Sequence, residues 1–164
     1  MLFWVVMLVS CNQSSNQQSM PKNSEAVTAT REQNTSSIKQ FFELLHERNV
    51  AAWGALWDEN GFIYIPYPVA NFPDTIRTRK TIQEGFGRLV AVFKSFDYHI
   101  KEIYPCVDPD VIVVEYTVTA VLVKDDAIYN GTNLAIFKFR HGKIAAYHDY
   151  FNPEKFIMVA EAVE

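Results

Sequence analysis

Cysteine and histidine are scarce in this chain. Its 164 residues include two cysteines, Cys11 and Cys106, and four histidines. None of them has the close spacing of a zinc motif, so no metal site is expected. The sequence also has no glycine-flanked nucleophile and no glycine-rich phosphate loop. Any catalysis is therefore expected to be proton transfer without a cofactor.

Basic charge is also in short supply. The formal net charge is -4 and the isoelectric point is near 5.6, which gives no broad positive field for a phosphate backbone. Nucleic acid is therefore not an expected partner. Apolar side chains, by contrast, are abundant: 49% of the residues are hydrophobic and 14% are aromatic. This is enough to build the core of one domain and to line a cavity for a small molecule.

A short apolar run at residues 2–9 leads into Ser10 and Cys11. The run is too short for a permanent transmembrane helix, but it suits a signal peptide, and its end resembles the bacterial lipobox. This predicts lipidation at Cys11 and a membrane-anchored protein of the bacterial cell envelope, on the periplasmic or extracytoplasmic face. No lysine or arginine precedes the run, so an unprocessed tail on a cytoplasmic protein stays the alternative.

The predicted organisation follows from these segments. Residues 1–11 form the lipoprotein-type signal peptide, residues 12–35 a disordered polar tether, and residues 36–164 one folded domain. Lipidation of Cys11 would leave Cys106 without an intramolecular partner, so no structural disulfide is expected.

Hydrophobic periodicity predicts helices in the first half of the domain and strands in the second. The first half is assigned an amphipathic helix at 36–49, a short helix at 51–57, a strand at 62–66, an irregular segment at 69–78 and a long helix at 79–96. The second half is assigned strands at 98–104, 111–123, 128–140 and 143–151, and an apolar tail at 156–160. The order indicates an α+β fold: a cone-shaped, curved antiparallel sheet with the helices over its concave face and a conical pocket at the wide end.

Several short segments in this order resemble a known family. They include Phe-Phe-Glu-Leu-Leu at 41–45, Ile-Pro-Tyr-Pro at 65–68, Gly-Lys-Ile at 142–144 and Tyr-His-Asp-Tyr at 147–150. The set resembles the SnoaL-like branch of the nuclear-transport-factor-2-like superfamily, and within it the PhzA/PhzB-type proteins of phenazine biosynthesis. The resemblance implies a homodimer with a pocket between the long helix and the sheet. The family often has a glycine just before the long helix, and this chain departs from that pattern with Thr78.

Asp149 is the candidate catalytic residue. Tyr147 and Phe151 flank it on its own strand face, and such surroundings raise the pKa of a carboxyl group towards the range of a general base. The resemblance gives the same residue, because SnoaL-like cyclases use an aspartate on the last strand as acid/base. A structural aspartate, bonded to backbone amides or to His148 of a neighbouring subunit, is the alternative. Strand alternation places His148 on the opposite face, at a dimer interface or the sheet exterior, unless a bulge intervenes.

Other candidate binding residues are assigned to the pocket or its mouth: Tyr64, Tyr67, Arg79, His99, Glu115 and Tyr129. Glu115 interrupts an apolar strand and needs a partner, for which Lys138 or Arg140 is the alternative to a functional role. Arg79 could bind an anionic group.

The sequence thus predicts a domain that binds a small, partly aromatic or carbonyl-bearing molecule, with isomerase, cyclase or dehydratase chemistry. A non-catalytic ligand-binding or dimerisation module on the cell envelope, which the superfamily also contains, is the alternative.

Overall fold

The computed structural model describes residues 22–69 and 72–163. The expected signal peptide, Cys11 and the first part of the expected tether lie outside the described residues. The described residues contain the elements α1 (Lys22–His46), α2 (Val50–Gly54), β1 (Trp57–Tyr64), β2 (Thr75–Arg77), α3 (Arg79–Ala91), β3 (Phe93–Pro105), β4 (Val111–Leu122), β5 (Ile128–Arg140), β6 (Lys143–Tyr150) and α4 (Pro153–Val163).

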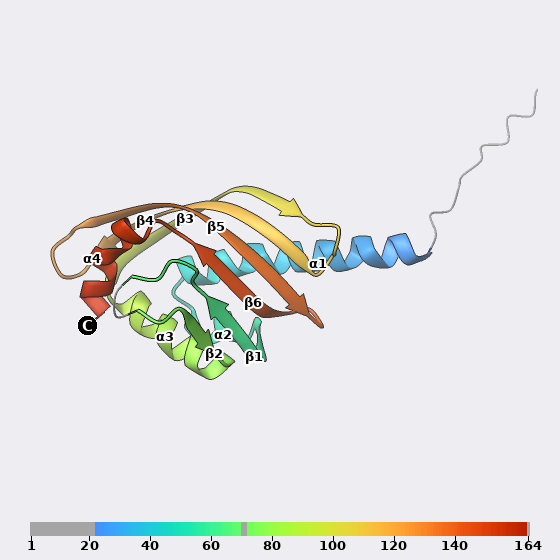
Figure 1. Ribbon diagram of the computed structural model, residues 1–164, viewed down its shortest axis with the longest axis horizontal. Coiled ribbons are helices and arrows are strands. Elements are labelled where there is room, and N and C mark those ends of the chain that lie inside the picture. The colour runs from blue at the N-terminus through green and yellow to red at the C-terminus, as the bar shows by residue number, and fades with distance from the viewer. Residues whose placement is uncertain (1–21, 70–71, 164) are drawn as a thin grey trace, which may run out of the picture.

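The strands form one six-stranded sheet in the order β2-β1-β6-β5-β4-β3. Figure 1 shows the long strands β3, β4 and β5 curving over α1, with α2 and α3 on the same concave side. The expected α+β fold with a curved sheet is confirmed. Strand β1 pairs with β6 in parallel, whereas the other neighbours are antiparallel. The sheet is therefore mixed and not antiparallel throughout as expected, because the chain passes through β2, α3 and strands β3 to β5 before β6 returns beside β1.

Helix α1 begins at Lys22, well before Ser36, so part of the segment expected to be a disordered tether is helical. Its polar side chains explain the difference. Asn34, which is 1% exposed, donates a 3.0 Å hydrogen bond from Nδ2 to the Asp110 carboxylate. Arg31 donates to a backbone carbonyl of the same loop between β3 and β4. The polar residues that predicted a disordered tether therefore hold α1 against the edge of the sheet.

Asn60 and Gly61 form a dipeptide that is typical of a turn, but here they lie inside β1. Trp57 pairs with Ile144 and Phe62 pairs with Ala146, so β1 carries several extra residues opposite a short stretch of β6. Extra residues in one strand form a bulge rather than ending the pairing. A side chain at Gly61 would come within 2.9 Å of the Ile144 carbonyl, so glycine allows the two backbones to approach.

Helix α3 is shorter than expected, because β3 starts directly after it. Phe93 and Phe96, which continue the helical spacing in the sequence, belong to the strand and are 2% and 6% exposed. Their burial against β4 satisfies the same apolar pattern in an extended conformation. The expected apolar tail is the helix α4, which packs on β5 through the ring contact of Tyr129 with Phe156.

Aromatic rings fill the space between α1 and the sheet. The ring of Phe41 lies 5.1 Å from that of Phe137 on β5 and 5.4 Å from that of Tyr147 on β6. Trp53 and Trp57 are fully buried beside it. Burial of large apolar side chains is the main stabilising term for a domain of this size. Among the described residues, no helix is long and apolar enough to cross a membrane.

Candidate functional site

Strand β6 separates the aspartate from the histidine. Tyr147 and Asp149 pair with Phe137 and Ala135 on β5 without interruption, so these residues alternate as in a regular strand. Asp149 faces the concave side of the sheet, where it lines a cavity. The His148 ring faces the other side, within 5.5 Å of the Tyr64 ring. The bulge in β6 precedes Tyr147 and leaves this alternation intact.

Asp149 accepts a hydrogen bond from a buried tyrosine. The Tyr116 hydroxyl donates to Asp149 Oδ1 at 2.9 Å. Because a hydroxyl has one proton, Tyr116 must accept from its other neighbours. These are the Tyr147 hydroxyl at 3.0 Å and Asn133 Nδ2 at 3.2 Å. The hydrogen bonds of this network therefore all donate in the direction of the Asp149 carboxylate.

Burial dominates the ionisation of Asp149. It raises the pKa of the carboxyl from 3.8 to about 6, although the hydrogen bond from Tyr116 and the nearby Tyr147 hydroxyl lower it. Burial first, and the charge of Asp149 second, raise the pKa of the nearby phenols Tyr98, Tyr116, Tyr129 and Tyr147, that of Tyr129 to about 12. At neutral pH the site thus contains an ionised carboxylate among protonated phenols.

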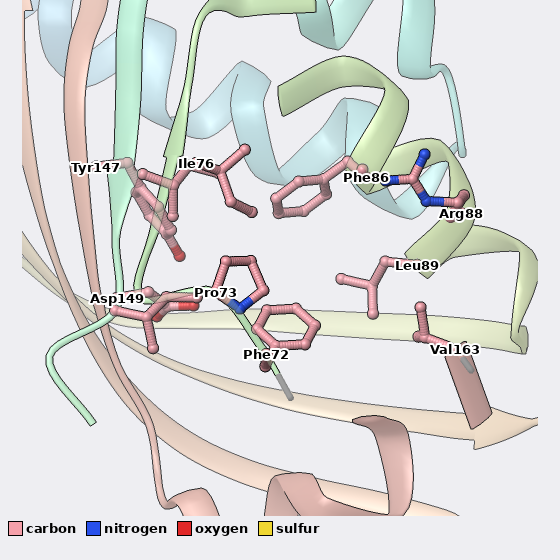
Figure 2. A pocket seen from close by; sticks show the side chains of 12 residues that line it. Phe72, Pro73, Ile76, Phe86, Arg88, Leu89, Tyr147, Asp149 and Val163 are labelled. Carbon is pink, nitrogen blue, oxygen red and sulfur yellow. The ribbon is translucent and has the colours of Figure 1, made fainter. Parts of the chain in front are cut away.

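Asp149 lies at the boundary of two adjoining cavities. The outer cavity has a volume of about 210 Å³ and the inner chamber about 60 Å³, and both are lined by Phe86, Leu89, Tyr147 and Asp149. Figure 2 shows Phe86 and Leu89 on α3 facing Tyr147 and Asp149 on β6 across the outer cavity. Other apolar walls of the outer cavity are Ile63, Ile65, Phe72 and Ile76.

The outer cavity suits a small molecule. Ordinary ligand sites enclose roughly 300–1,000 Å³, whereas an apolar cavity of about 150 Å³ already accepts benzene. At about 210 Å³, the outer cavity matches one ring with a few substituents. The exposed Arg88 lies at its rim and supplies positive charge there.

The structure brings together only part of the residues assigned to the site. Tyr147, Asp149, Phe151 and Tyr129 line the inner chamber. The other candidates line neither of these two cavities. Tyr64 and Tyr67 are 38% and 62% exposed on the outside, and neither lines the two cavities.

The charged candidates form ion pairs outside the cavities. Glu115 pairs with Lys101 across β3 and β4 at 3.3 Å, and not with Lys138 or Arg140. The reason is the strand register, because Leu134 of β5 lies opposite Glu115, whereas Lys138 lies opposite Val111.

The start of α3 and the outer part of β3 hold the last two candidates. Arg79 pairs with Glu59 of β1 at 3.3 Å in an exposed position. His99 lines an open surface groove between α1 and β3 together with His46 and Lys39, away from Asp149. Neither residue lines the outer cavity or the inner chamber.

Three residues of the site were missed by sequence reasoning: Tyr98, Tyr116 and Asn133. All line the inner chamber. The signal was strand alternation, since Tyr116 shares its face with the buried Val114 and Val118. Asn133 pairs with Tyr116 across the sheet, so the two face the same side. An inward Tyr116 on β4 therefore implies an inward Asn133 on β5.

No group of three or more potential metal ligands occurs in residues 22–69 and 72–163. Cys106 is a free thiol on the loop after β3. The polar side-chain groups that line the two cavities are one carboxyl, four phenols, one amide and, at the rim, the Arg88 guanidinium.

A curved mixed sheet with helices and a cavity on its concave side, and a carboxyl on its last strand, defines a small α+β domain of the nuclear-transport-factor-2-like class. Within that class, the chain belongs to the SnoaL-like domain family, whose model matches residues 38–147.

Solved structures share this fold. A Bacillus subtilis protein provisionally named as an isomerase superposes with a TM-score of 0.73 and 21% identity, covering 81% of this chain and 96% of its own. The phenazine biosynthesis-related protein PhzB2 of Pseudomonas aeruginosa superposes with a TM-score of 0.69 and 16% identity, covering 84% of this chain and 90% of its own. SalBIII is an epoxide hydrolase/cyclase-like enzyme with a role in pyran ring formation in the polyether salinomycin. It superposes with a TM-score of 0.65 and 16% identity, covering 76% of this chain and 94% of its own. These likenesses confirm the fold that the sequence implied.

Proposed function

We propose that this protein binds a small, mainly apolar molecule with a carbonyl group in the outer cavity, and that Asp149 transfers a proton next to that carbonyl. The observation that carries the proposal is the position of Asp149: an ionisable carboxyl at the meeting of two apolar cavities, with a pKa of about 6. A base is most effective when its pKa lies near the working pH.

The surrounding residues suit this role. A carboxylate removes a proton from the carbon beside the carbonyl, forming an enolate, and the resulting acid returns the proton to the same or another carbon. Tyr116 keeps Oδ1 of Asp149 in place, which leaves the second carboxylate oxygen for the substrate. Apolar walls on α3 and β1 exclude water, which strengthens electrostatic interactions inside the site. An isomerase, cyclase or dehydratase step requires this kind of proton transfer.

Hydrogen–deuterium exchange of cyclohexanone in D2O tests the proposal without knowledge of the natural substrate. NMR measures how fast the protons beside the carbonyl are replaced. We expect the protein to accelerate exchange and Asp149→Asn to abolish the acceleration, while Asp97→Asn, which changes an exposed aspartate of β3, retains it. If Asp149→Asn accelerates exchange as well as the unaltered protein, Asp149 is not the base. Binding of cyclohexanone without acceleration would favour the non-catalytic binding module.

We also propose that the domain is held on the bacterial cell envelope by a lipid on Cys11. The proposal rests on the apolar run and lipobox-like segment of the sequence. Palmitate labelling in a bacterial host tests it: label is expected on the unaltered chain and absent from Cys11→Ala. Label that persists in Cys11→Ala would contradict the anchor.

A homodimer through the outer face of the sheet is the third proposal. Apolar side chains on this face include Leu134, which is 39% exposed, and Tyr64, which is 38% exposed. Sedimentation equilibrium is expected to give a dimer for the unaltered chain and a monomer for Leu134→Lys. A monomer in both cases would contradict it.

A further inference from the structure

Asn133 has a buried acceptor without a partner. The residue is 6% exposed and lines the inner chamber. Its Nδ2 donates to the Tyr116 hydroxyl, but no donor in the described part of the chain lies within hydrogen-bond distance of its Oδ1, although the amide is near enough to Tyr129 to lower the pKa of that phenol. The assignment of the two amide atoms follows from the network, because Tyr116 uses its proton on Asp149 and must accept from the amide. A buried acceptor without a donor costs free energy, so its retention needs a reason.

Gly131 on the inner face of β5 leaves space beside Oδ1 of Asn133. Tyr129, Gly131 and Asn133 alternate on that face, and all three are buried. A Cβ atom at Gly131 would lie 2.7 Å from the Tyr129 hydroxyl and 2.9 Å from Asn133 Oδ1. The phenol and the amide oxygen therefore converge on the place where any other residue would put a side chain.

The inner chamber adjoins the outer cavity at Asp149. Its volume is about 60 Å³, and one water molecule needs about 10–15 Å³ by this kind of measure. The chamber therefore has space for a polar substituent but not for a ring. A ligand whose ring occupies the outer cavity could extend one short substituent past Asp149 towards Asn133.

We propose that the inner chamber is a polar subsite in which Asn133 Oδ1 accepts a hydrogen bond from a hydroxyl group of the ligand. Tyr129 completes the subsite, because a hydroxyl group both donates and accepts and its oxygen can accept from the phenol. The ligand class is thus a single-ring molecule with a hydroxyl group at one end. The inference rests on the proposed function only in requiring that a ligand enters the outer cavity.

Asn133 is then a residue that determines specificity rather than a catalytic residue. A site built to hydrogen-bond a hydroxyl group discriminates strongly against the same molecule without it, because the buried polar group is left unpaired. Asp149 and the apolar walls would bind either molecule. Discrimination between two ligands that differ only in the hydroxyl group therefore reports on Asn133.

Phenol and toluene provide this comparison, since they have nearly the same size and shape. Isothermal titration calorimetry is expected to show at least tenfold tighter binding of phenol by the unaltered protein. Asn133→Leu should reduce the preference to less than threefold without weakening toluene binding. Gly131→Ala, which retains every polar atom but fills the space between them, should weaken phenol selectively and serves if Asn133→Leu does not fold. Tyr104→Phe, an exposed tyrosine of β3, is the control and should leave both affinities unchanged.

Two patterns of binding would overturn the inference. One is equal affinity for phenol and toluene in the unaltered protein, which leaves binding by the outer cavity, and so the proposed function, intact. The other is a phenol preference that persists in Asn133→Leu and Gly131→Ala, which would place the hydroxyl group at Asp149 instead. Failure to bind either probe would contradict the inference and the proposed ligand class together, whereas exchange of cyclohexanone would still test Asp149 separately.

Discussion

The Tyr116 hydroxyl on β4 donates a 2.9 Å hydrogen bond to Oδ1 of Asp149 on β6, across the intervening strand β5. This hydrogen bond joins the candidate base to a tyrosine that the alternating pattern of β4 places in the core. The bond stabilises the carboxylate, while burial opposes ionisation. The ionisation of Asp149 therefore depends on a balance that single substitutions can shift in either direction.

Removing this hydrogen bond should raise the pKa of Asp149 further. A hydrogen bond to a charged group is worth about 1.5–3 kcal/mol, which corresponds to one or two pH units. In Tyr116→Phe, the pH midpoint of cyclohexanone exchange should move above 6 by about one unit. Tyr104→Phe should leave it in place, and an unchanged midpoint in Tyr116→Phe would show that the hydroxyl does not act on Asp149.

Neutralising Asp149 should stabilise the protein at neutral pH. The folded-state pKa of this carboxyl is raised from 3.8 to about 6, so the folded state binds the proton more tightly than the unfolded state. The resulting stabilisation is complete below pH 3.8 and is lost as the pH rises through 6. At pH 7.5 the ionised carboxyl costs about 3 kcal/mol, which Asp149→Asn would recover.

Urea unfolding at pH 4 and pH 7.5 measures this effect. Asp149→Asn should be more stable than the unaltered protein at pH 7.5 and about equal to it at pH 4, whereas Asp97→Asn should differ little at either pH. A variant that is less stable at pH 7.5 would show that Asp149 is a structural aspartate, which is the alternative that strand position alone left open.

Filling the outer cavity should block ligand binding without damaging the fold. A Cβ atom at Gly85 has nothing within 4 Å, and Gly85 lines the cavity. Gly85→Leu should reduce the affinity for cyclohexanone more than tenfold and raise stability by about 1 kcal/mol through helix propensity. Gly87→Leu is the matched control on the same helix, because Gly87 does not line the cavity. Equal loss of affinity in both variants would place the ligand elsewhere.

Glu115 should be dispensable for both binding and exchange. Its ion pair with Lys101 joins partly exposed side chains on the outer face of the sheet, where such pairs contribute roughly 0–1 kcal/mol. Glu115→Gln should leave the exchange rate within twofold and the melting temperature nearly unchanged. A tenfold loss of exchange would return Glu115 to the site.

The sequence predicted the fold well because its second half alternates clearly. The alternation around Val118 and Phe137 predicts these strands almost to the residue, and the order of the elements indicates a curved sheet. The same alternation correctly placed Asp149 and His148 on opposite faces. Local patterns were sufficient wherever the contacts that stabilise an element come from adjacent strands.

Contacts between distant segments account for the errors. The polar side chain of Asn34 becomes buried only because the β3–β4 loop accepts its hydrogen bonds. Trp57 continues a helical spacing, but pairing with β6 makes it the first residue of a strand. Glu115 pairs with Lys101 instead of Lys138 or Arg140 on β5, because the register places Leu134 opposite Glu115. Such facts require the order and register of strands in the sheet, which no local pattern contains.

Titration of the Asp149 carboxyl carbon by NMR tests the central claim most directly. The claim is that the fold holds this carboxyl in apolar surroundings and raises its pKa into the range of a general base. Assignment by comparison with Asp149→Asn identifies the resonance. The account predicts a midpoint near pH 6, as burial requires. A midpoint near pH 4, as in an exposed aspartate, would contradict it.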